Sequence, residues 1–290
     1  MNRFQAIMSS SRVTILGGKT GELNMSDDIS PSTGSKPKAS GEAEPPIAFL
    51  LDENLGLTAD ECPGPGILPD LGIKAVSTTD LPSLDKSVVA HEPDIVYLPI
   101  ADFHRLFAKG DHYYRGFAIA TSKFTGTTNL PSILVVRKDD PANSLDDLEG
   151  ATYGIINRSC SSSYFPPALM LLQKGKTIDE FLKVEEMPAW QAQVDAVVSG
   201  RVRTTMVPED VWKTTPKNAQ DTKIIGRYDN PTPPVVVARD GLDERVTKTL
   251  LEALINWAPK WEAVYGAFRP YYYADVHDFF HELDKLPPGM

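Results

Sequence analysis

Short apolar runs alternate with segments of helical character in the first half of the chain. The runs 47–51, 74–77 and 94–99 predict strands, whereas the segments 81–90 and 102–109 predict helices. Strands that alternate with helices are typical of a parallel or mixed sheet with helices on both faces. The pattern therefore predicts an α/β fold.

Two later apolar runs echo each other. Residues 131–139 and 234–240 each predict a strand, and each is followed by an acidic stretch that starts a helix, at 144–148 and at 242–246. Between them lies a second α/β unit. Its predicted elements are strands at 151–156 and 203–207 and helices at 166–174 and 190–199.

This repetition predicts two lobes, in which the chain leaves the first lobe, builds the second and returns. Lobe 1 comprises residues 47–137 and 234–290, and lobe 2 comprises residues 138–233. Crossing strands near 135–139 and 234–239 would connect the lobes and act as a hinge. Residues 1–46 are predicted to be a disordered arm, because the Gly, Ser, Pro, Lys and Glu that dominate from residue 18 onward cannot bury enough apolar surface to fold.

Composition narrows the class of function. The 290 residues are 41% hydrophobic and 23% charged, as is ordinary for a globular protein, and their net charge of -10 argues against nonspecific nucleic-acid binding and a basic membrane-docking face. No stretch approaches the ~20 apolar residues of a membrane span. Cys62 and Cys160 make neither a metal spacing nor a disulfide framework, and His277 and His281 lack a third metal ligand. The sequence therefore predicts no metal and no cofactor.

The N-terminal residues carry no export signal. The apolar run 4–8 is broken by the serines at 9–11, well short of a signal-peptide core. As written, the sequence predicts a cytoplasmic protein. A periplasmic location follows instead if the start is misassigned or a signal has been removed.

The segment 157–175 is the most informative about function. Five small polar or thiol side chains, at 159–163, precede a helix start marked by Pro166 and Pro167 and a helix stop at Gly175. The free N–H groups and positive dipole end of such a helix favour anions, and hydroxyls just before it add donors. The segment predicts an anion or polar-ligand site. The alternative is a helix cap with a solvated serine loop.

Several stretches together have a familiar order. They are Glu-Pro-Asp-Ile-Val-Tyr-Leu-Pro (92–99), Ser-Ile-Leu-Val-Val-Arg-Lys-Asp (132–139), Ser-Leu-Asp-Asp-Leu-Glu-Gly-Ala (144–151), the serine cluster closing on Tyr164, Val-Val-Ser-Gly-Arg-Val (197–202) and Pro-Glu-Asp-Val-Trp (208–212). In this combination the chain resembles, over roughly residues 47–258, the phosphonate-binding PhnD-like group of type 2 periplasmic binding proteins, the solute receptors of ABC importers. The resemblance implies two α/β lobes, each a mixed sheet flanked by helices, with a ligand held in the cleft between them.

The resemblance also implies a role for the serine cluster. Cys160, Ser161 and Ser162 fall at the positions of a Ser-Thr-Ser trio that holds the anionic head group, with Tyr164 just behind. Cys160 departs from the pattern, because a thiol is a much weaker donor than a hydroxyl.

Further positions follow from the same resemblance. Phe103 falls where the family often has a tyrosine on the cleft wall, and Trp190 and Gln193 fall near a polar segment that closes over the ligand. Trp190 either stacks on the ligand or packs in the core. Pro208 replaces an acidic residue, and together with Trp190 this predicts a ligand that is less cationic and more apolar or aromatic.

Other polar residues near these segments have two interpretations each. Asp52 and Glu53 end the first strand and either line the cleft or begin a turn. Asp102 presents a carboxylate to the ligand or caps the helix that begins there. Arg158, beside Ser159, supplies the positive charge that an anion needs or faces solvent.

Together these features predict non-enzymatic binding of a small anionic or polar-aromatic molecule in an interlobe cleft. The alternatives are a cytoplasmic enzyme of cofactor or small-molecule metabolism built on the same fold, and a cytoplasmic ligand sensor. The expected partners are the small-molecule ligand and an ABC transporter permease. The aromatic residues within 257–273 either pack against the first lobe or form a homodimer contact.

Overall fold

The computed structural model describes one folded part of the chain. The described residues are 46–52, 58, 60, 66–108, 110, 112–229, 233–259 and 264–287. The chain divides into two units, residues 1–44 and 45–290, and all described elements belong to the second unit. The predicted disordered arm lies outside the described residues up to residue 45, as do Glu53 and Cys62.

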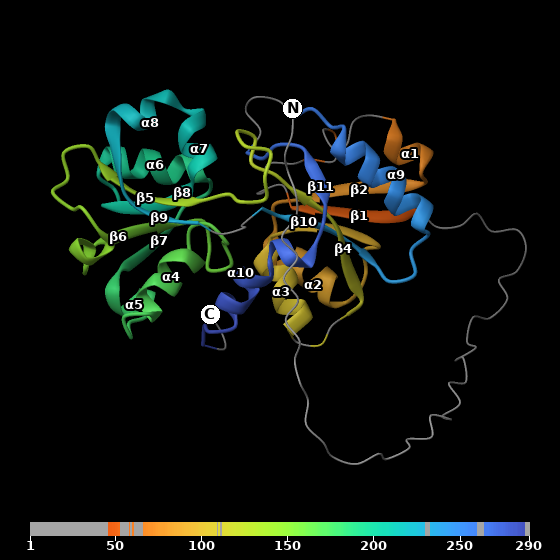
Figure 1. Cartoon of the computed structure of the whole chain (residues 1–290), viewed down its shortest axis with the longest axis horizontal. Helices are drawn as coiled ribbons and strands as arrows, with labels where there is room; N and C mark the ends of the chain where they lie inside the picture. Colours follow the sequence, from red (N-terminus) through yellow and green to blue (C-terminus); the bar gives the residue numbers. More distant parts are fainter. Residues whose placement is uncertain are drawn as a thin grey trace, which may run out of the picture. The chain divides into compact units, whose positions relative to one another are not determined.

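Six strands form the first sheet, in the order β11-β4-β10-β3-β1-β2 (Figure 1). Their bounds are β1 (Ile47–Asp52), β2 (Ile73–Thr78), β3 (Ile95–Leu98), β4 (Tyr114–Ala120), β10 (Val235–Arg239) and β11 (Phe268–Pro270). Strand β1 is parallel to β2 and β3, whereas β10 is antiparallel to β3 and β4, and β11 is antiparallel to β4. The sheet is therefore mixed.

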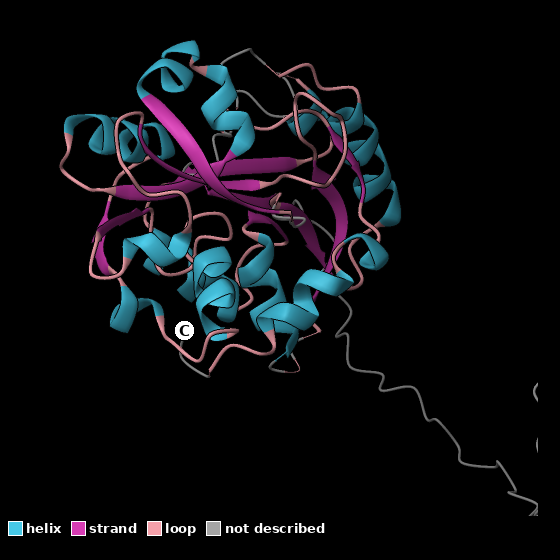
Figure 2. Ribbon diagram, turned by 60° about the vertical axis from the view of Figure 1, so that its left-hand side comes forward, coloured by secondary structure: helices cyan, strands magenta, loops and turns pink. Residues whose placement is uncertain are grey.

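Helices cover both faces of this sheet (Figures 1 and 2). The helical elements of this part are α1 (Ile67–Asp70), α2 (Leu81–Val89), α3 (Ile100–Ala108), α9 (Glu244–Ile255), the 3₁₀ helix η3 (Tyr273–Asp275) and α10 (His277–Leu283). Strand β3 reads Ile-Val-Tyr-Leu and is buried at every position. A strand that is apolar on both faces is expected where helices cover both faces of its sheet.

Five strands form the second sheet, in the order β7-β6-β8-β5-β9. Their bounds are β5 (Ser132–Arg137), β6 (Thr152–Ile155), β7 (Lys183–Glu186), β8 (Thr204–Pro208) and β9 (Thr222–Tyr228). Strand β6 is parallel to β7 and β8, and β5 is antiparallel to β8 and β9. The helical elements here are η2 (Leu145–Leu148), α4 (Phe165–Leu172), α5 (Ile178–Phe181), α6 (Trp190–Ser199), α7 (Glu209–Thr214) and α8 (Pro216–Asp221).

Local sequence sets the ends of several helices. The Asp80 side chain accepts a hydrogen bond from the Ser83 N–H (3.2 Å) at the start of α2. Thr177 and Glu180 form a capping box at α5. Helix α6 stops at Gly200, whose φ of 80° lies in the left-handed region that glycine adopts without steric cost.

The boundary between the two sheets differs from the prediction. Strand β5, which was assigned to lobe 1, pairs on both sides with strands of the second sheet. The chain crosses between the sheets after β4 and again after β9, so the strands predicted to act as a hinge near 135–139 and 234–239 do not cross. The physical reason is that an apolar strand such as β5 gains most when both of its edges are hydrogen-bonded within one sheet.

The register of the second sheet brings several connecting segments to one edge. The carboxyl ends of the parallel strands β6, β7 and β8 share that edge. Ser132, the first residue of the antiparallel strand β5, pairs with Pro208 at the end of β8 and so lies there too. The segments that follow β6, β7 and β8, together with Ser132, form the carboxyl edge of the second sheet.

The first sheet has a corresponding edge. Val235, which begins β10, pairs with Leu98 at the end of β3 and with Ile119 near the end of β4. Phe268, which begins β11, pairs with Ala120. These residues and the segments next to them form the carboxyl edge of the first sheet.

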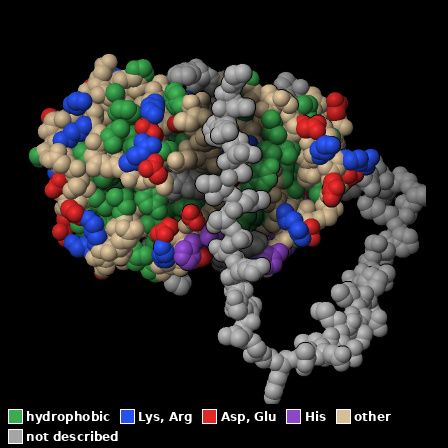
Figure 3. All heavy atoms as spheres, in the orientation of Figure 1, with side chains coloured by type: hydrophobic (Ala, Val, Ile, Leu, Met, Phe, Trp, Pro, Cys, Tyr) green, Lys and Arg blue, Asp and Glu red, His purple; other side chains and the backbone are tan. Residues whose placement is uncertain are grey.

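Charged side chains of both signs are interspersed on the described surface seen in Figure 3. Many of them are paired, as in Arg203 with Asp140 (2.9 Å) and Arg158 with Asp179 (2.7 Å). The net charge of -10 is therefore not gathered into a single acidic field on the coloured part of this face.

Candidate ligand-binding site

The serine segment forms a closed turn between β6 and α4. The Tyr153 hydroxyl donates to the Ser163 carbonyl (2.6 Å), and the Ile156 N–H donates to Ser163 Oγ (3.1 Å). The Asn157 side chain accepts a hydrogen bond from the Ser159 N–H (2.8 Å). These bonds fix the turn to the end of strand β6, so Ser163 has a structural role.

The serines of this turn are buried rather than solvated. Ser161 is 5% exposed, Ser162 is 2% exposed and Ser163 is fully buried. Cys160 is a free, buried thiol in the same apolar cluster as Trp190. The turn is therefore not the solvated serine loop that was the alternative interpretation.

Four buried side chains lie at the carboxyl edge of the second sheet or at the start of helix α6. Each of them has a polar atom with no hydrogen-bond partner among the described residues. They are Ser132, Ser161, Trp190 and Gln193. Leaving a buried donor or acceptor unsatisfied costs about 1–3 kcal/mol per group. Native proteins rarely tolerate several such groups on adjacent segments unless a ligand or ordered water binds them.

Strand register explains how these residues come together. Ser132 begins β5, Ser161 follows β6, and Trp190 and Gln193 lie in the first turn of α6, which follows β7. The four residues are therefore contributed by three different connections at the same end of one sheet. Ligands of open α/β sheets bind at such strand ends.

Gln193 is held at one end of its side-chain amide. Its Oε1 lies 2.5 Å from Thr205 Oγ1, and Thr205 Oγ1 lies 2.8 Å from the Gly154 carbonyl oxygen. Gln193 and Thr205 are both fully buried. The amide is thus fixed to β8, and its other end has no partner in the described part of the chain.

Trp190 connects the carboxyl edges of the two sheets. Its ring packs edge-to-face on Tyr265, with ring centroids 6.2 Å apart. The next residue, Gly266, donates its N–H to the Thr121 carbonyl (2.7 Å) beside β4. A Cβ on Gly266 would lie 2.9 Å from Thr121 Oγ1, so only glycine fits this approach without a shift.

A second contact joins α7 to the first connecting segment. Asp210 is 3% exposed, and its Oδ2 accepts a hydrogen bond from the Lys123 N–H (3.0 Å). Burial raises the pKa of the Asp210 carboxyl above its usual range, although hydrogen bonds from Ser122 and Lys123 oppose this effect. This carboxylate fixes the start of the segment 121–131 to the second sheet.

The comparisons with known proteins concern the family and the fold. The family model described as "ABC transporter, phosphonate, periplasmic substrate-binding protein" matches residues 70–270. The chain belongs to this family. No curated protein matches the sequence.

Solved structures of low sequence identity share the fold. The XAC2383 protein of Xanthomonas citri bound to ATP has a TM-score of 0.61 at 16% identity over 82% of this chain and 98% of its own. The binding protein PA3383 of a Pseudomonas aeruginosa phosphonate transporter has a TM-score of 0.61 at 18% identity, with 83% and 86% covered. PhnD1 of Prochlorococcus marinus, solved with methylphosphonate, has a TM-score of 0.60 at 16% identity, with 83% and 100% covered. The fold is thus that of the two-lobed type 2 periplasmic binding proteins, as predicted.

Within the described ranges, none of the helices combines the length and the apolar composition that a membrane crossing requires. The described residues likewise include no group of three or more His, Cys, Asp or Glu side chains arranged to hold a metal ion.

The Arg158 side chain is bonded to Asp179 in α5 and to Tyr164, which precedes α4. Its guanidinium forms two hydrogen bonds with the Asp179 carboxylate (2.8 and 2.7 Å) and one with the Tyr164 hydroxyl (3.1 Å). The pKa of Arg158 is raised and that of Asp179 is lowered, in each case mainly by their mutual hydrogen bond. Arg158 is therefore not a free cation, and Tyr164 is buried behind the turn.

Two predicted residues, Asp102 and Phe103, lie in the first turn of α3, which follows β3 directly. Phe103 packs edge-to-face on Tyr271 and Phe280, with centroids 5.9 and 6.4 Å apart. Asp102 pairs with Arg105 on the next turn of α3. Asp52 ends β1 opposite Thr78, and Glu53 lies outside the described residues.

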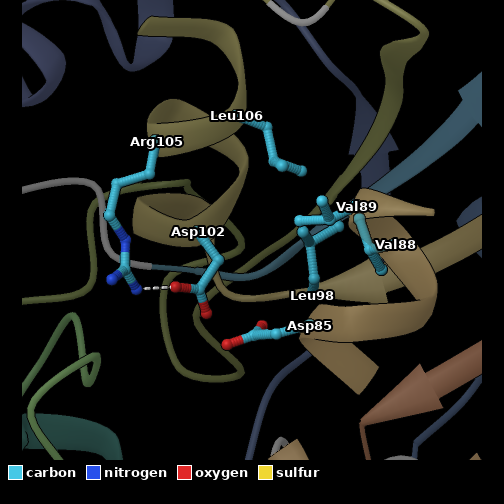
Figure 4. Close-up of a pocket in the computed structure, with 7 residues that line it drawn as sticks. All are labelled: Asp85, Val88, Val89, Leu98, Asp102, Arg105 and Leu106. Atoms are coloured by element: carbon cyan, nitrogen blue, oxygen red, sulfur yellow. Dashed lines mark hydrogen bonds and ion pairs between the residues drawn. The ribbon is translucent and has the colours of Figure 1, made fainter. Parts of the chain in front are cut away.

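Asp102 lines a small pocket between α2 and α3 (Figure 4). The pocket has a volume of about 110 Å³. Its lining residues are Asp85, Val88, Val89, Leu98, Asp102, Arg105 and Leu106. Figure 4 shows the Asp85 and Asp102 carboxylates on one side of the pocket, with Leu98, Val88 and Val89 beside them.

The structure thus groups some predicted residues and separates others. Ser161, Ser162, Cys160, Trp190 and Gln193 belong to the turn and helix at the carboxyl edge of the second sheet. Sequence reasoning missed Ser132, Thr205 and Tyr265, because only strand register and the return of the chain place them beside that edge.

Proposed function

We propose that this chain is the substrate-binding component of an ABC importer and that it binds a small oxyanion at the carboxyl edge of the second sheet. The observation that carries the proposal is the group of buried polar side chains without partners at Ser132, Ser161, Trp190 and Gln193. A ligand with several oxygen atoms would pair with all four at once. Family membership supports an importer as the setting.

Neutral groups suffice to hold such an anion. Hydroxyls and an indole N–H are donors. The start of α4 adds no free N–H, because Pro166 and Pro167 lack one and the Phe165 N–H donates to the Cys160 carbonyl. Preorganised neutral donors stabilise an anion without a buried cation, whose own desolvation would be costly. This agrees with the engagement of Arg158 by Asp179.

Closure over the ligand would use the contacts between the two edges. Trp190 lies beside the second sheet and Tyr265 beside the first, and the connecting segment 121–131 is a place where backbone rotation can occur without breaking a sheet. A ligand that contacts groups of both sheets stabilises the closed state by its differential affinity. Trp190 then contributes both its ring and its N–H.

The same proposal includes a partner and a compartment. The family description names periplasmic proteins of a transporter, which supports a periplasmic location and a permease as partner. The cytoplasmic location considered above has no support from the comparisons. A homodimer through the C-terminal aromatic residues stays a prediction.

Isothermal titration calorimetry of the purified protein with methylphosphonate, inorganic phosphate and methanesulfonate tests the proposal. At least one of these probes is expected to bind, and Ser132→Ala should weaken that binding about tenfold, since a hydrogen bond to a charged group contributes ~1.5–3 kcal/mol. Ser199→Ala is the matched control, because Ser199 Oγ donates to the Ala196 carbonyl at the far end of α6 (3.1 Å). Absence of binding for all three probes, or equal loss in both variants, would contradict the proposal.

A further inference from the structure

The C-terminal helix α10 packs on one helix from each lobe. It follows β11 and η3 along the chain, so it is covalently joined to the lobe built on the first sheet. It contacts α3, which follows β3 of the first sheet, and α4, which follows β6 of the second sheet. Figure 1 shows α10 between these two helices. The helix therefore joins the lobes at a place other than the contact of Trp190 with Tyr265.

One face of α10 is fixed to α3. The Phe280 ring stacks on the His104 imidazole, with ring centroids 4.3 Å apart, and packs on Phe103 at 6.4 Å. Asp284 comes four residues after Phe280, and its Oδ1 lies 2.8 Å from His104 Nε2. Because residues four apart lie on the same side of a helix, Phe280 and Asp284 form one stripe toward α3. This stripe attaches α10 to the first lobe.

A second buried stripe lies next to the first. Phe279 and Leu283 are 2% and 8% exposed and are also four residues apart. Each of them precedes a residue of the α3 stripe by one position, which turns it by about 100° around the helix axis. Glu282, three residues after Phe279, lies on the same side. Burial and, to a smaller extent, the Glu282 carboxylate raise the pKa of Tyr228 in β9 to about 12, so this side of α10 faces the second sheet.

Side chains of both lobes share one hydrophobic cluster at this helix. The cluster contains Phe279, Phe280 and Leu283 of α10, Phe103 of α3 and Phe165 of α4. Close-packed apolar groups lose much of their contact energy as soon as a small gap opens between them. Rotation of one lobe away from the other would therefore cost the contacts on one side of α10. Phe165 directly follows the serine segment, so the helix that would lose these contacts is the one that begins at the candidate site.

We propose that α10 is a clamp that favours the closed arrangement of the two lobes, whether or not a ligand is bound. The arrangement in this structure is the closed one, because Trp190 meets Tyr265 and the candidate site is buried. When the lobes separate, α10 stays on α3 and the stripe of Phe279 and Leu283 releases α4. The inference goes beyond the proposed function, since it holds for any ligand.

Two leucines provide a matched pair of variants. Leu283→Ala removes apolar atoms from the stripe toward α4, whereas Leu254→Ala removes the same atoms from α9, which packs on β4 and β11 of the first sheet. Both variants create a cavity and lower the stability of the folded chain. Only Leu283→Ala is expected to lower the ratio of closed to open molecules, by about tenfold or more. Leu286→Ala, a half-buried residue packed against the same cluster, should act in the same direction with a smaller effect if Leu283→Ala does not fold.

Fluorine NMR of the protein labelled with 5-fluorotryptophan measures opening at the other contact. Trp190, assigned by loss of its signal in Trp190→Phe, is buried against Tyr265 and belongs to a different hydrophobic cluster from α10. In the wild-type protein its signal should move little between H₂O and D₂O. The movement should grow in Leu283→Ala and stay small in Leu254→Ala. Trp212 and Trp257, which each bond or pack within one lobe, should keep their signals in both variants.

Three results would overturn the clamp. They are an unchanged Trp190 signal in Leu283→Ala, an equal change in Leu254→Ala, and a change of the Trp212 or Trp257 signal as large as that of Trp190. The last result would mean that Leu283 stabilises the interior of a lobe rather than the contact between lobes. The measurement uses no ligand, so the calorimetric failure of all three oxyanion probes would contradict the proposed function and leave the clamp standing.

Discussion

The pocket between α2 and α3 and the carboxyl edge of the second sheet are both polar, but they differ in whether their polar side chains have hydrogen-bond partners. The pocket between α2 and α3 contains charged side chains, but Asp102 is bonded to Arg105 and the remaining wall is largely apolar (Figure 4). The carboxyl edge of the second sheet contains mostly neutral groups, and four of them have no partner among the described residues. Under the proposal above, a cluster of unmet hydrogen bonds, rather than formal charge, distinguishes the proposed ligand site from the other pocket.

The largest expected effect separates these two places directly. Ser161→Ala combined with Ser162→Ala should weaken oxyanion binding by about 2–4 kcal/mol, because two buried hydroxyls next to the start of α4 are removed. Calorimetric titration measures the loss. Asp102→Asn is the matched variant in the other pocket and should leave the affinity unchanged; a loss there as large as in the serine variant would invert the comparison.

A smaller effect is expected for the buried carboxylate beside the first connecting segment. Burial raises the pKa of Asp210, so its ionised form destabilises the folded state above that pKa, and the cost disappears once pH falls below the ordinary carboxyl range. Asp210→Asn keeps an acceptor for the Lys123 N–H and removes the charge.

Chemical denaturation at a series of pH values tests the sign. Asp210→Asn is expected to raise the free energy of unfolding by up to about 1 kcal/mol at neutral pH, and the advantage should vanish in acid as wild-type Asp210 becomes neutral. An advantage that grows in acid would show that the carboxylate is stabilised in the folded protein.

The smallest effect on affinity and stability is expected for Arg158, the cation next to the serine segment that is paired with Asp179. Arg158→Gln should leave the affinity for oxyanions unchanged and lower the free energy of unfolding by only about 0–1 kcal/mol, because its bridge to Asp179 is half exposed. Asp179→Asn should behave alike, since it removes the same pair. A drop in affinity specific to Arg158→Gln would show that the cation reaches the ligand and would weaken the contrast with the pocket between α2 and α3.

Much of the fold could be predicted because hydrophobic periodicity is a local property. The strand predicted at 94–99 is β3, and the helix predicted at 190–199 has the bounds of α6. Helix α4 begins at Phe165, one residue before the prolines that predicted its start. Short or half-buried strands such as β7, with the sequence Lys-Val-Glu-Glu, carry no such pattern and were missed.

The candidate site was predictable in part for a similar reason. The serine cluster is contiguous in sequence and precedes a helix start, so its segment could be identified. Ser132 stands at the start of an apolar strand with no polar neighbour pattern, and only its pairing with Pro208 places it at the same edge. The pairing of Arg158 with Asp179 (2.7 Å) could not be predicted, because the two residues are 21 positions apart.

The sequence by itself determined the α/β class, the two-lobed organisation and the segment that begins the site, because strand and helix periods, prolines and family motifs are written in neighbouring residues. The tertiary structure alone decided that β5 belongs to the second sheet, that Trp190 meets Tyr265, and that Thr205 holds Gln193. These outcomes depend on register and on burial, which are set by residues distant in sequence. Whether a buried polar atom has a partner is a property of the whole fold, and at this edge that property marks the proposed site.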